Sequence, residues 1–144
     1  MIERLLSIRD HLDTVLKELK HDSLTNSEWG RVADLQRLLA PFKEQTDSLQ
    51  TDTLSLSSVL PSILELSLHL QDQSLPKAHS NALLQALRQR FSSLLDSCCP
   101  SFDPLPAAAC LLDPTVSAVM MRDDMAQLLV SAISYIKLQV SLKP

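Results

Sequence analysis

The chain has 144 residues, 45% of them hydrophobic, which is enough for one ordinary domain with a continuous core. One glycine stands against eight prolines, so the sequence has no glycine-rich phosphate loop and no dinucleotide-binding fingerprint. A formal net charge of -4 has the wrong sign for a domain that binds nucleic-acid phosphates by itself. Composition therefore disfavours most nucleotide enzymes and autonomous nucleic-acid binding.

The cysteines and the N-terminus bear on the compartment. Cys98 and Cys99 are adjacent and Cys110 stands apart, a spacing that gives neither a disulfide framework nor a zinc signature. Charges interrupt the N-terminal apolar residues, so we expect no signal peptide, and no apolar run approaches the ~20 residues that span a bilayer. We expect an intracellular, soluble protein with no membrane segment.

The first predicted element is an amphipathic helix over residues 2 to 19. Its apolar residues recur at spacings of three and four, at Leu5, Ile8, Leu12, Val15 and Leu19. The same spacing suits pairing with another helix, in this chain or in a second copy. However, it lasts under three heptads, fewer than a sustained coiled coil usually shows, so packing within the chain is favoured.

A capping box is predicted to start the second helix. Thr25 and Glu28 have the spacing at which each side chain binds a backbone N–H at the other's end, and Leu24 and Trp29 flank the cap as a hydrophobic staple. The apolar pattern then continues past Pro41 and Phe42. Because proline removes a helical hydrogen bond, we expect one bent helix or two collinear ones, ending near residue 51.

Two further helices are predicted over 54–72 and about 77–96. The leucines of the first fall at too many angles for one stripe, so this helix should be central and buried on several sides. The second has one apolar face, and Arg88 and Arg90 with Lys77 form a modest basic cluster on it. A solvated face is the favoured interpretation of this cluster, and contact with a partner or a phosphate is the alternative.

Two Asp-Pro pairs are predicted to start the last two helices. Asp103 should cap a short helix with Pro104 in its first turn, where the missing N–H has no helical partner to lose. Asp113 and Pro114 repeat this arrangement before the last helix, whose apolar face should carry Met121, Met125, Leu128, Leu129, Ala132, Ile136 and Val140. The sequence thus predicts a single all-α domain over 1–144, with about six helices.

Groups that could perform chemistry are few. No motif joins a cysteine to any of the four histidines, so the thiols are interpreted as inert core or loop residues. The histidines lack the spacing of a metal site. Asp123 and Asp124 are interpreted as an anionic cap on the last helix rather than as cation ligands. No catalytic residue, metal or cofactor is therefore predicted.

Four successive segments carry a family resemblance: MIERLL, LTNSEWGRVADLQRLLAPFKEQTDSLQ, SLSSVLPSILELSLHL and AAACLLDP. Their order and spacing resemble the helical part of hAT-superfamily transposases and of their domesticated zinc-finger and BED-finger descendants. Thr115 departs from the family pattern, which usually has arginine there, so any contact made by that arginine is absent. The pattern is matched at Leu24, Thr25, Trp29, Pro41, Phe42, Thr46, Ser57 or Ser58, Val59, Pro61, Ala109, Leu112, Asp113 and Pro114.

The resemblance implies the helical insertion of such a protein, without the ribonuclease-H-like core whose three acidic residues bind two metal ions. It implies a non-catalytic fragment of a larger nuclear zinc-finger protein. Such a fragment would oligomerise, a homodimer being plausible, or recruit a chromatin-associated protein in transcription regulation, and DNA would bind only to other parts of the full-length protein. The alternative is an auxiliary part of an active transposase, in which Lys77, Arg88 and Arg90 touch DNA phosphates.

Overall fold

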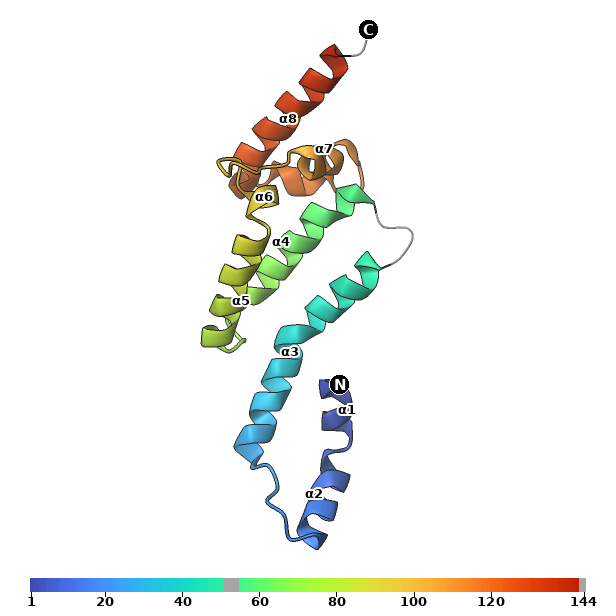
Figure 1. Ribbon diagram of the computed structural model, residues 1–144, viewed down its shortest axis with the longest axis vertical. Helices are drawn as coiled ribbons and strands as arrows, with labels where there is room; N and C mark the ends of the chain where they lie inside the picture. Colours follow the sequence, from blue (N-terminus) through green and yellow to red (C-terminus); the bar gives the residue numbers. More distant parts are fainter. Residues whose placement is uncertain (51–54, 143–144) are drawn as a thin grey trace.

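The computed structural model describes residues 1–50 and 55–142, apart from the side chain of Leu49, as helices joined by turns (Figure 1). No strand forms within these ranges, so the all-α prediction is confirmed. The described residues form eight α-helices rather than about six, because two predicted helices are broken. They are α1 (Ile2–Ser7), α2 (Arg9–Glu18), α3 (Asn26–Leu49), α4 (Val59–Leu70), α5 (Lys77–Arg90), α6 (Ser92–Leu95), α7 (Leu105–Leu112) and α8 (Ala126–Ser141), with 3-10 turns η1 (Leu56–Ser58), η2 (Ser117–Met121) and η3 (Asp123–Met125).

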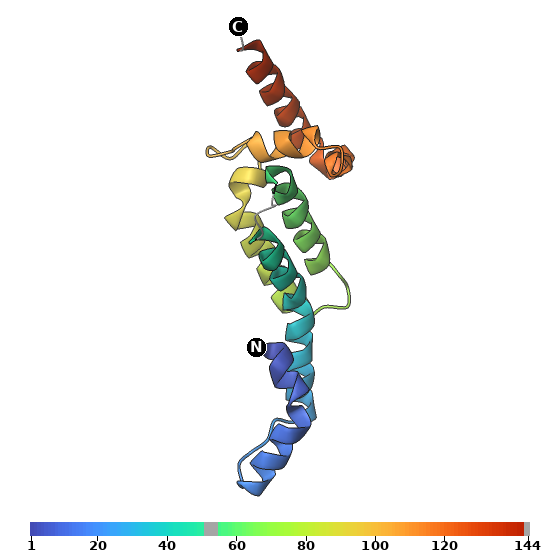
Figure 2. The same ribbon diagram turned by 90° about the vertical axis from the view of Figure 1, so that its right-hand side faces the viewer.

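The helices follow one another along the long axis of the molecule (Figures 1 and 2). At one end, α1 packs on α3 and α2 lies beyond it. The end of α3 lies with α4 and α5 in the middle, and α7 and α8 form the other end. In both views the second half of α8 extends away from the other helices.

The predicted helix over 2–19 is broken at Ile8, whose backbone leaves the helical region (φ -101°, ψ 8°). The Ser7 hydroxyl donates to the Arg4 carbonyl at 2.8 Å, a side-chain bond that competes with helix propagation. Neither α1 nor α2 contains a buried residue, and Ile8, Val15 and Leu19 are exposed. The favoured packing of this stripe within the chain is therefore wrong at Ile8, Val15 and Leu19, whereas Leu12 is half-buried.

The capping box of the second helix is confirmed. The Glu28 N–H donates to Thr25 Oγ1 at 3.3 Å, and the Thr25 N–H donates to Glu28 Oε2 at 2.8 Å. Trp29 is buried under the Arg9 guanidinium, which lies 5.3 Å from its ring centre, whereas Leu24 is exposed. The box thus fixes the start of α3 at the predicted residue.

Replacing the cap tests this start. We expect Thr25→Ala to lower the free energy of unfolding by about 1 kcal/mol, because the Glu28 N–H loses its acceptor. Ser27→Ala is the matched control, since Ser27 is exposed in the same turn and the described residues include no hydrogen-bond partner for its side chain. Urea unfolding followed by circular dichroism measures both, and equal stability of Thr25→Ala and wild type would contradict the assignment.

Pro41 lies inside α3, which continues through it as the single bent helix that was predicted as one of two forms (Figure 1). The helix also packs on two sides: Gln36, Leu39 and Ala40 line a shallow groove with Ile2 of α1, while Leu38 is buried against α4 and α5. Leu35 is consequently exposed although it continues the predicted stripe. Phe42 is half-buried against the same cluster as Leu38.

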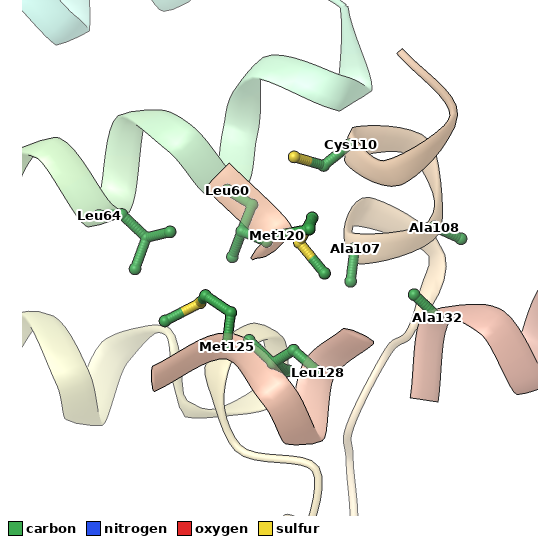
Figure 3. Packing of buried hydrophobic residues seen from close by; sticks show 9 residues of the cluster. All are labelled: Leu60, Leu64, Ala107, Ala108, Cys110, Met120, Met125, Leu128 and Ala132. Carbon is green, nitrogen blue, oxygen red and sulfur yellow. The ribbon is translucent and has the colours of Figure 1, made fainter. Parts of the chain in front are cut away.

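The prediction of a central helix is confirmed for α4, although the 54–72 segment begins with η1 and Leu54 lies outside the described residues. One face of α4 enters a first hydrophobic cluster with α7 and α8, shown in Figure 3. The other enters a second cluster with α3 and α5. Leu95 packs against both, so the two clusters join into one core. The α4 side chains are Leu60 and Leu64 in the first cluster and Ile63, Leu66 and Leu70 in the second.

The segment predicted as one helix over 77–96 is interrupted at Phe91, where φ is -107° and ψ is 22°. Phe91 at the break and Leu94 after it both pack against the second cluster. The next helix starts one residue later than predicted, because Pro104 precedes α7 instead of lying in its first turn. Asp103 still accepts a hydrogen bond from the Leu105 N–H at 2.9 Å. It therefore binds a backbone N–H at this helix start, as predicted, although it lies one residue before the N-cap.

The predicted start of the last helix is wrong. Asp113 ends α7, and Pro114 lies exposed in the turn that follows. The turns η2 and η3 come next, so Met121 lies outside α8 and is exposed. Asp123 and Asp124 precede α8 but form no side-chain cap, because Asp124 instead binds Arg122 through two bonds of 2.9 and 3.0 Å.

Candidate interaction surface

Helix α8 carries more exposed large apolar side chains than any other described helix. Leu128 and Ala132 attach α8 to the first cluster, while Val130, at 64% exposure, faces away from it. Beyond Ile136 the helix no longer packs against the cluster, and its apolar side chains there stay exposed. Exposed apolar surface of this extent is typical of protein-interaction sites. The exposed apolar side chains, called the α8 surface below, are Val130 and Ile133 near the first cluster and Leu138, Val140 and Leu142 around the C-terminal end of the helix, beyond the cluster.

Helix α8 has one charged side chain, and three of its serine hydroxyls are hydrogen-bonded within the helix. Lys137 is the only charged residue in the helix. The hydroxyls of Ser131, Ser134 and Ser141 each donate to the carbonyl four residues earlier, at 2.8 to 3.0 Å. A hydroxyl that is bonded within its own helix can be covered by an apolar partner without losing its hydrogen bond. These serines therefore leave the surface compatible with an apolar occupant.

A cleft of about 430 Å³ lies between α4, α5 and the turn before α8. Leu64, Leu68 and Met125 form its apolar part. Its charged groups are of both signs: Arg122 is bound to Asp124, whereas Arg88 has no hydrogen bond or ion pair within the part of the chain that the structure describes. The cleft therefore combines an apolar part with the Arg88 guanidinium, which has no partner among the described residues.

The structure separates the predicted basic cluster. Lys77 is the first residue of α5 and donates to Gln73, whereas Arg88 and Arg90 belong to its last turn, about 16 Å away along the helix axis. Residues two positions apart point to different sides of a helix, so Arg88 lines the cleft while Arg90 does not. The three cations thus form no continuous patch.

The segments that contain the predicted motif residues Ser57 and Asp113 meet at a hydrogen-bond cluster. Ser57 Oγ donates to Asp113 Oδ2 at 2.6 Å, which joins η1 to the end of α7. Thr115, at the position where the family has arginine, donates to Asp113 Oδ1 from its N–H and its hydroxyl. The Ser57 bond above all, with those from Thr115, holds the pKa of the Asp113 carboxyl below 3.8. The role of Asp113 is therefore a link between helices.

This link gives the stability a dependence on pH. The pKa of Asp113 is lower in the folded state than its ordinary value of 3.8. The stabilisation by Asp113 is therefore present at pH values above this ordinary pKa and is lost as the pH falls through the folded-state pKa. We expect Ser57→Ala to lower the melting temperature at neutral pH by about 4 °C and to weaken the acid dependence. Ser58→Ala, whose hydroxyl makes no bond within the described ranges, is the control. Equal melting and equal acid dependence of the two variants would contradict the role of Ser57.

The thiols show no catalytic arrangement in the described structure. Cys110 is buried in the first cluster, and desolvation raises its pKa above 9.0. Hydrogen bonding to Ser101 lowers the pKa of Cys99, whose sulfur lies 3.3 Å from Ser101 Oγ. Among the described residues, no group of three or more His, Cys, Asp or Glu side chains is placed to hold a metal ion. No helix formed by the described residues is both long and apolar enough to cross a membrane.

Sequence reasoning missed most of the α8 surface and the cleft. It placed Val140 on the same apolar face as Leu128 and Ala132 and singled out neither Val130 nor Leu138. One usable signal was present, since Lys137 is the only charge between residues 126 and 142. No protein-family model, curated protein or solved structure matches the chain, so the hAT resemblance stays a prediction.

Proposed function

We propose that the chain is a non-catalytic helical module that binds a protein partner through the α8 surface. The observation that carries this proposal is the exposure of Val130, Val140 and Leu142, each above 60%, on a helix with one charge. Burying such side chains against a partner helix or groove supplies the main driving force for association.

The proposed partner is chromatin-associated and the proposed location is the nucleus. Both follow from the resemblance to domesticated hAT transposases, in which this region would belong to a larger zinc-finger protein that regulates transcription. A protein partner suits the surface better than DNA does, because DNA binding depends on several cations near phosphates. The α8 surface offers Lys137 alone, and Lys77 lies far from Arg88.

A pull-down from nuclear extract, at moderate salt and with nuclease present, tests the proposal. We expect mass spectrometry to identify one dominant chromatin-associated protein with the wild-type chain and at least about tenfold less of it with Val140→Glu, because a charge placed in an apolar contact is desolvated. Gln139→Glu adds the same charge one residue away and should retain the partner.

Two outcomes contradict the proposal. One is equal recovery of the partner with Val140→Glu and Gln139→Glu, both verified as folded by circular dichroism. The other is recovery that occurs only when DNA is left intact and falls steeply with salt, which favours the DNA-contacting alternative. In that case Arg88→Ala and Arg90→Ala should weaken binding while Val140→Glu leaves it unchanged.

A further inference from the structure

We propose that the chain also self-associates through α2, whose outer face pairs in antiparallel orientation with the same face of a second copy. The inference rests on the proposed interaction role and deepens it, because it names a surface and its occupant. This surface lies at the opposite end of the molecule from α8 (Figure 1). The two contacts are therefore physically independent.

The first observation is that α2 is covered on one side only. Arg9 lies over the Trp29 ring of α3, and Leu12 and Leu16 are half-buried. The other side carries a shallow groove of about 290 Å³, called the α2 groove below. At 100° per residue the groove centre lies roughly opposite Arg9 around the helix, so α3 leaves the groove open. The groove is lined by Asp10, His11, Thr14, Val15 and Glu18.

Apolar side chains form one edge of this face. Ile8, Val15 and Leu19 are 44%, 48% and 61% exposed. Ile8 and Leu19 flank the two ends of α2, and Val15 lies between them at spacings of seven and four residues, which places all three beside the groove. These are the a/d spacings with which helices pair. The apolar edge is therefore the part of the face whose burial against a partner is favourable.

The arrangement of charges identifies the occupant. A two-fold axis perpendicular to α2, at the level midway between Asp13 and Thr14, exchanges residues that lie equally far from this point. It places Asp10 opposite the second copy's Lys17 on the outer edge, and Ile8 opposite the second copy's Leu19 on the apolar edge. Opposite charges face each other and apolar residues face each other, as an isologous interface requires.

These charged groups are available for such contacts. Within the described residues, the side chains of Asp10 and Lys17 make no hydrogen bond or ion pair. Exposed ion pairs add little affinity, so their main effect is to fix the orientation and register of the apolar contact. The reciprocal pairing of Asp10 with Lys17 makes the interaction specific for a second copy in antiparallel orientation.

Charge reversal tests this pairing by sedimentation equilibrium at low salt. The wild-type mass should rise with concentration toward twice 16.0 kDa. Asp10→Lys and Lys17→Glu each place like charges opposite each other at two symmetric positions, so each should weaken dimerisation by at least about tenfold. An equimolar mixture of the two variants should form heterodimers, because the introduced lysine of one chain then faces the introduced glutamate of the other, and the native Lys17 faces the native Asp10. Glu44→Lys reverses an exposed charge on α3 and should dimerise like wild type.

A wild-type chain that stays monomeric at every concentration overturns the inference, and so does a mixture of folded variants that fails to associate. Single variants that dimerise as tightly as wild type also overturn it. The α8 proposal is tested separately, because Val140→Glu should abolish partner capture and leave the dimer intact. Loss of the dimer with partner capture retained would remove this inference alone, and the reverse result would remove the α8 contact alone.

Discussion

Leu60→Ala is expected to lower the free energy of unfolding by about 3 kcal/mol, because it removes a wholly buried side chain and leaves a cavity. Leu60 projects from α4 toward Met120 and Ala107 in the first cluster (Figure 3). Backbone on both sides of this site belongs to packed helices, which limits how far the cavity can collapse. A small domain is stable by only about 5–15 kcal/mol, so the variant should lose a large part of its stability.

Urea unfolding with linear extrapolation measures the effect, and an unchanged slope would show that the compactness of the unfolded state is unaffected. Leu68→Ala is the matched control, since Leu68 lies on the same helix and is 49% exposed. We expect it to cost less than about 1 kcal/mol. Similar losses for Leu60→Ala and Leu68→Ala would contradict the position of α4 between the clusters.

Ala132→Leu is expected to destabilise the chain by about 1–3 kcal/mol through overpacking. Ala132 of α8 is wholly buried against α7, whose contact residues Ala107 and Ala108 are also small (Figure 3). Close approach of two helices requires short side chains at the crossing, so the larger side chain must force the helices apart or adopt a strained rotamer. Thermal melting with circular dichroism detects the loss.

Ala126→Leu makes the same chemical change at an exposed position of α8 and should alter stability by no more than about 0.5 kcal/mol. Melting of Ala132→Leu at the wild-type temperature would show that α8 does not pack on α7 as described. Because the residues of the α8 surface lie outside the first cluster, a destabilised but folded Ala132→Leu variant should still capture the proposed partner at low temperature.

Local patterns predicted the features that depend on neighbouring residues. The capping box at Thr25 and Glu28 forms as expected, because both bonds close within one helical turn. The continuation of α3 through Pro41 and the central position of α4 also follow from apolar spacing within one segment. The candidate site was harder to predict, because the low charge of residues 126–142 does not show which of the apolar side chains, such as Val130 and Val140, stay exposed.

The incorrect predictions have a common physical cause, which is that contacts between distant segments decide which helical face is covered. Asp113 and Pro114 have the local form of a helix start, yet the Asp113 carboxylate accepts a bond from Ser57, 56 residues away, which joins it to η1 instead of to the last helix. Leu38 rather than Leu35 is buried because α3 packs against α4 and α5 beyond the region that it shares with α1.

The sequence by itself determined the all-helical class, the start of α3 and the burial of α4 on several sides, since helical period and capping are properties of short segments. Only the tertiary structure decided that α2 and α8 each keep an uncovered side. A stripe of apolar residues indicates a surface whose burial is favourable, but the same stripe can pack in a core or in an interface. Val15 and Val140 stay 48% and 69% exposed among the described residues, so their further burial must come from outside this part of the chain.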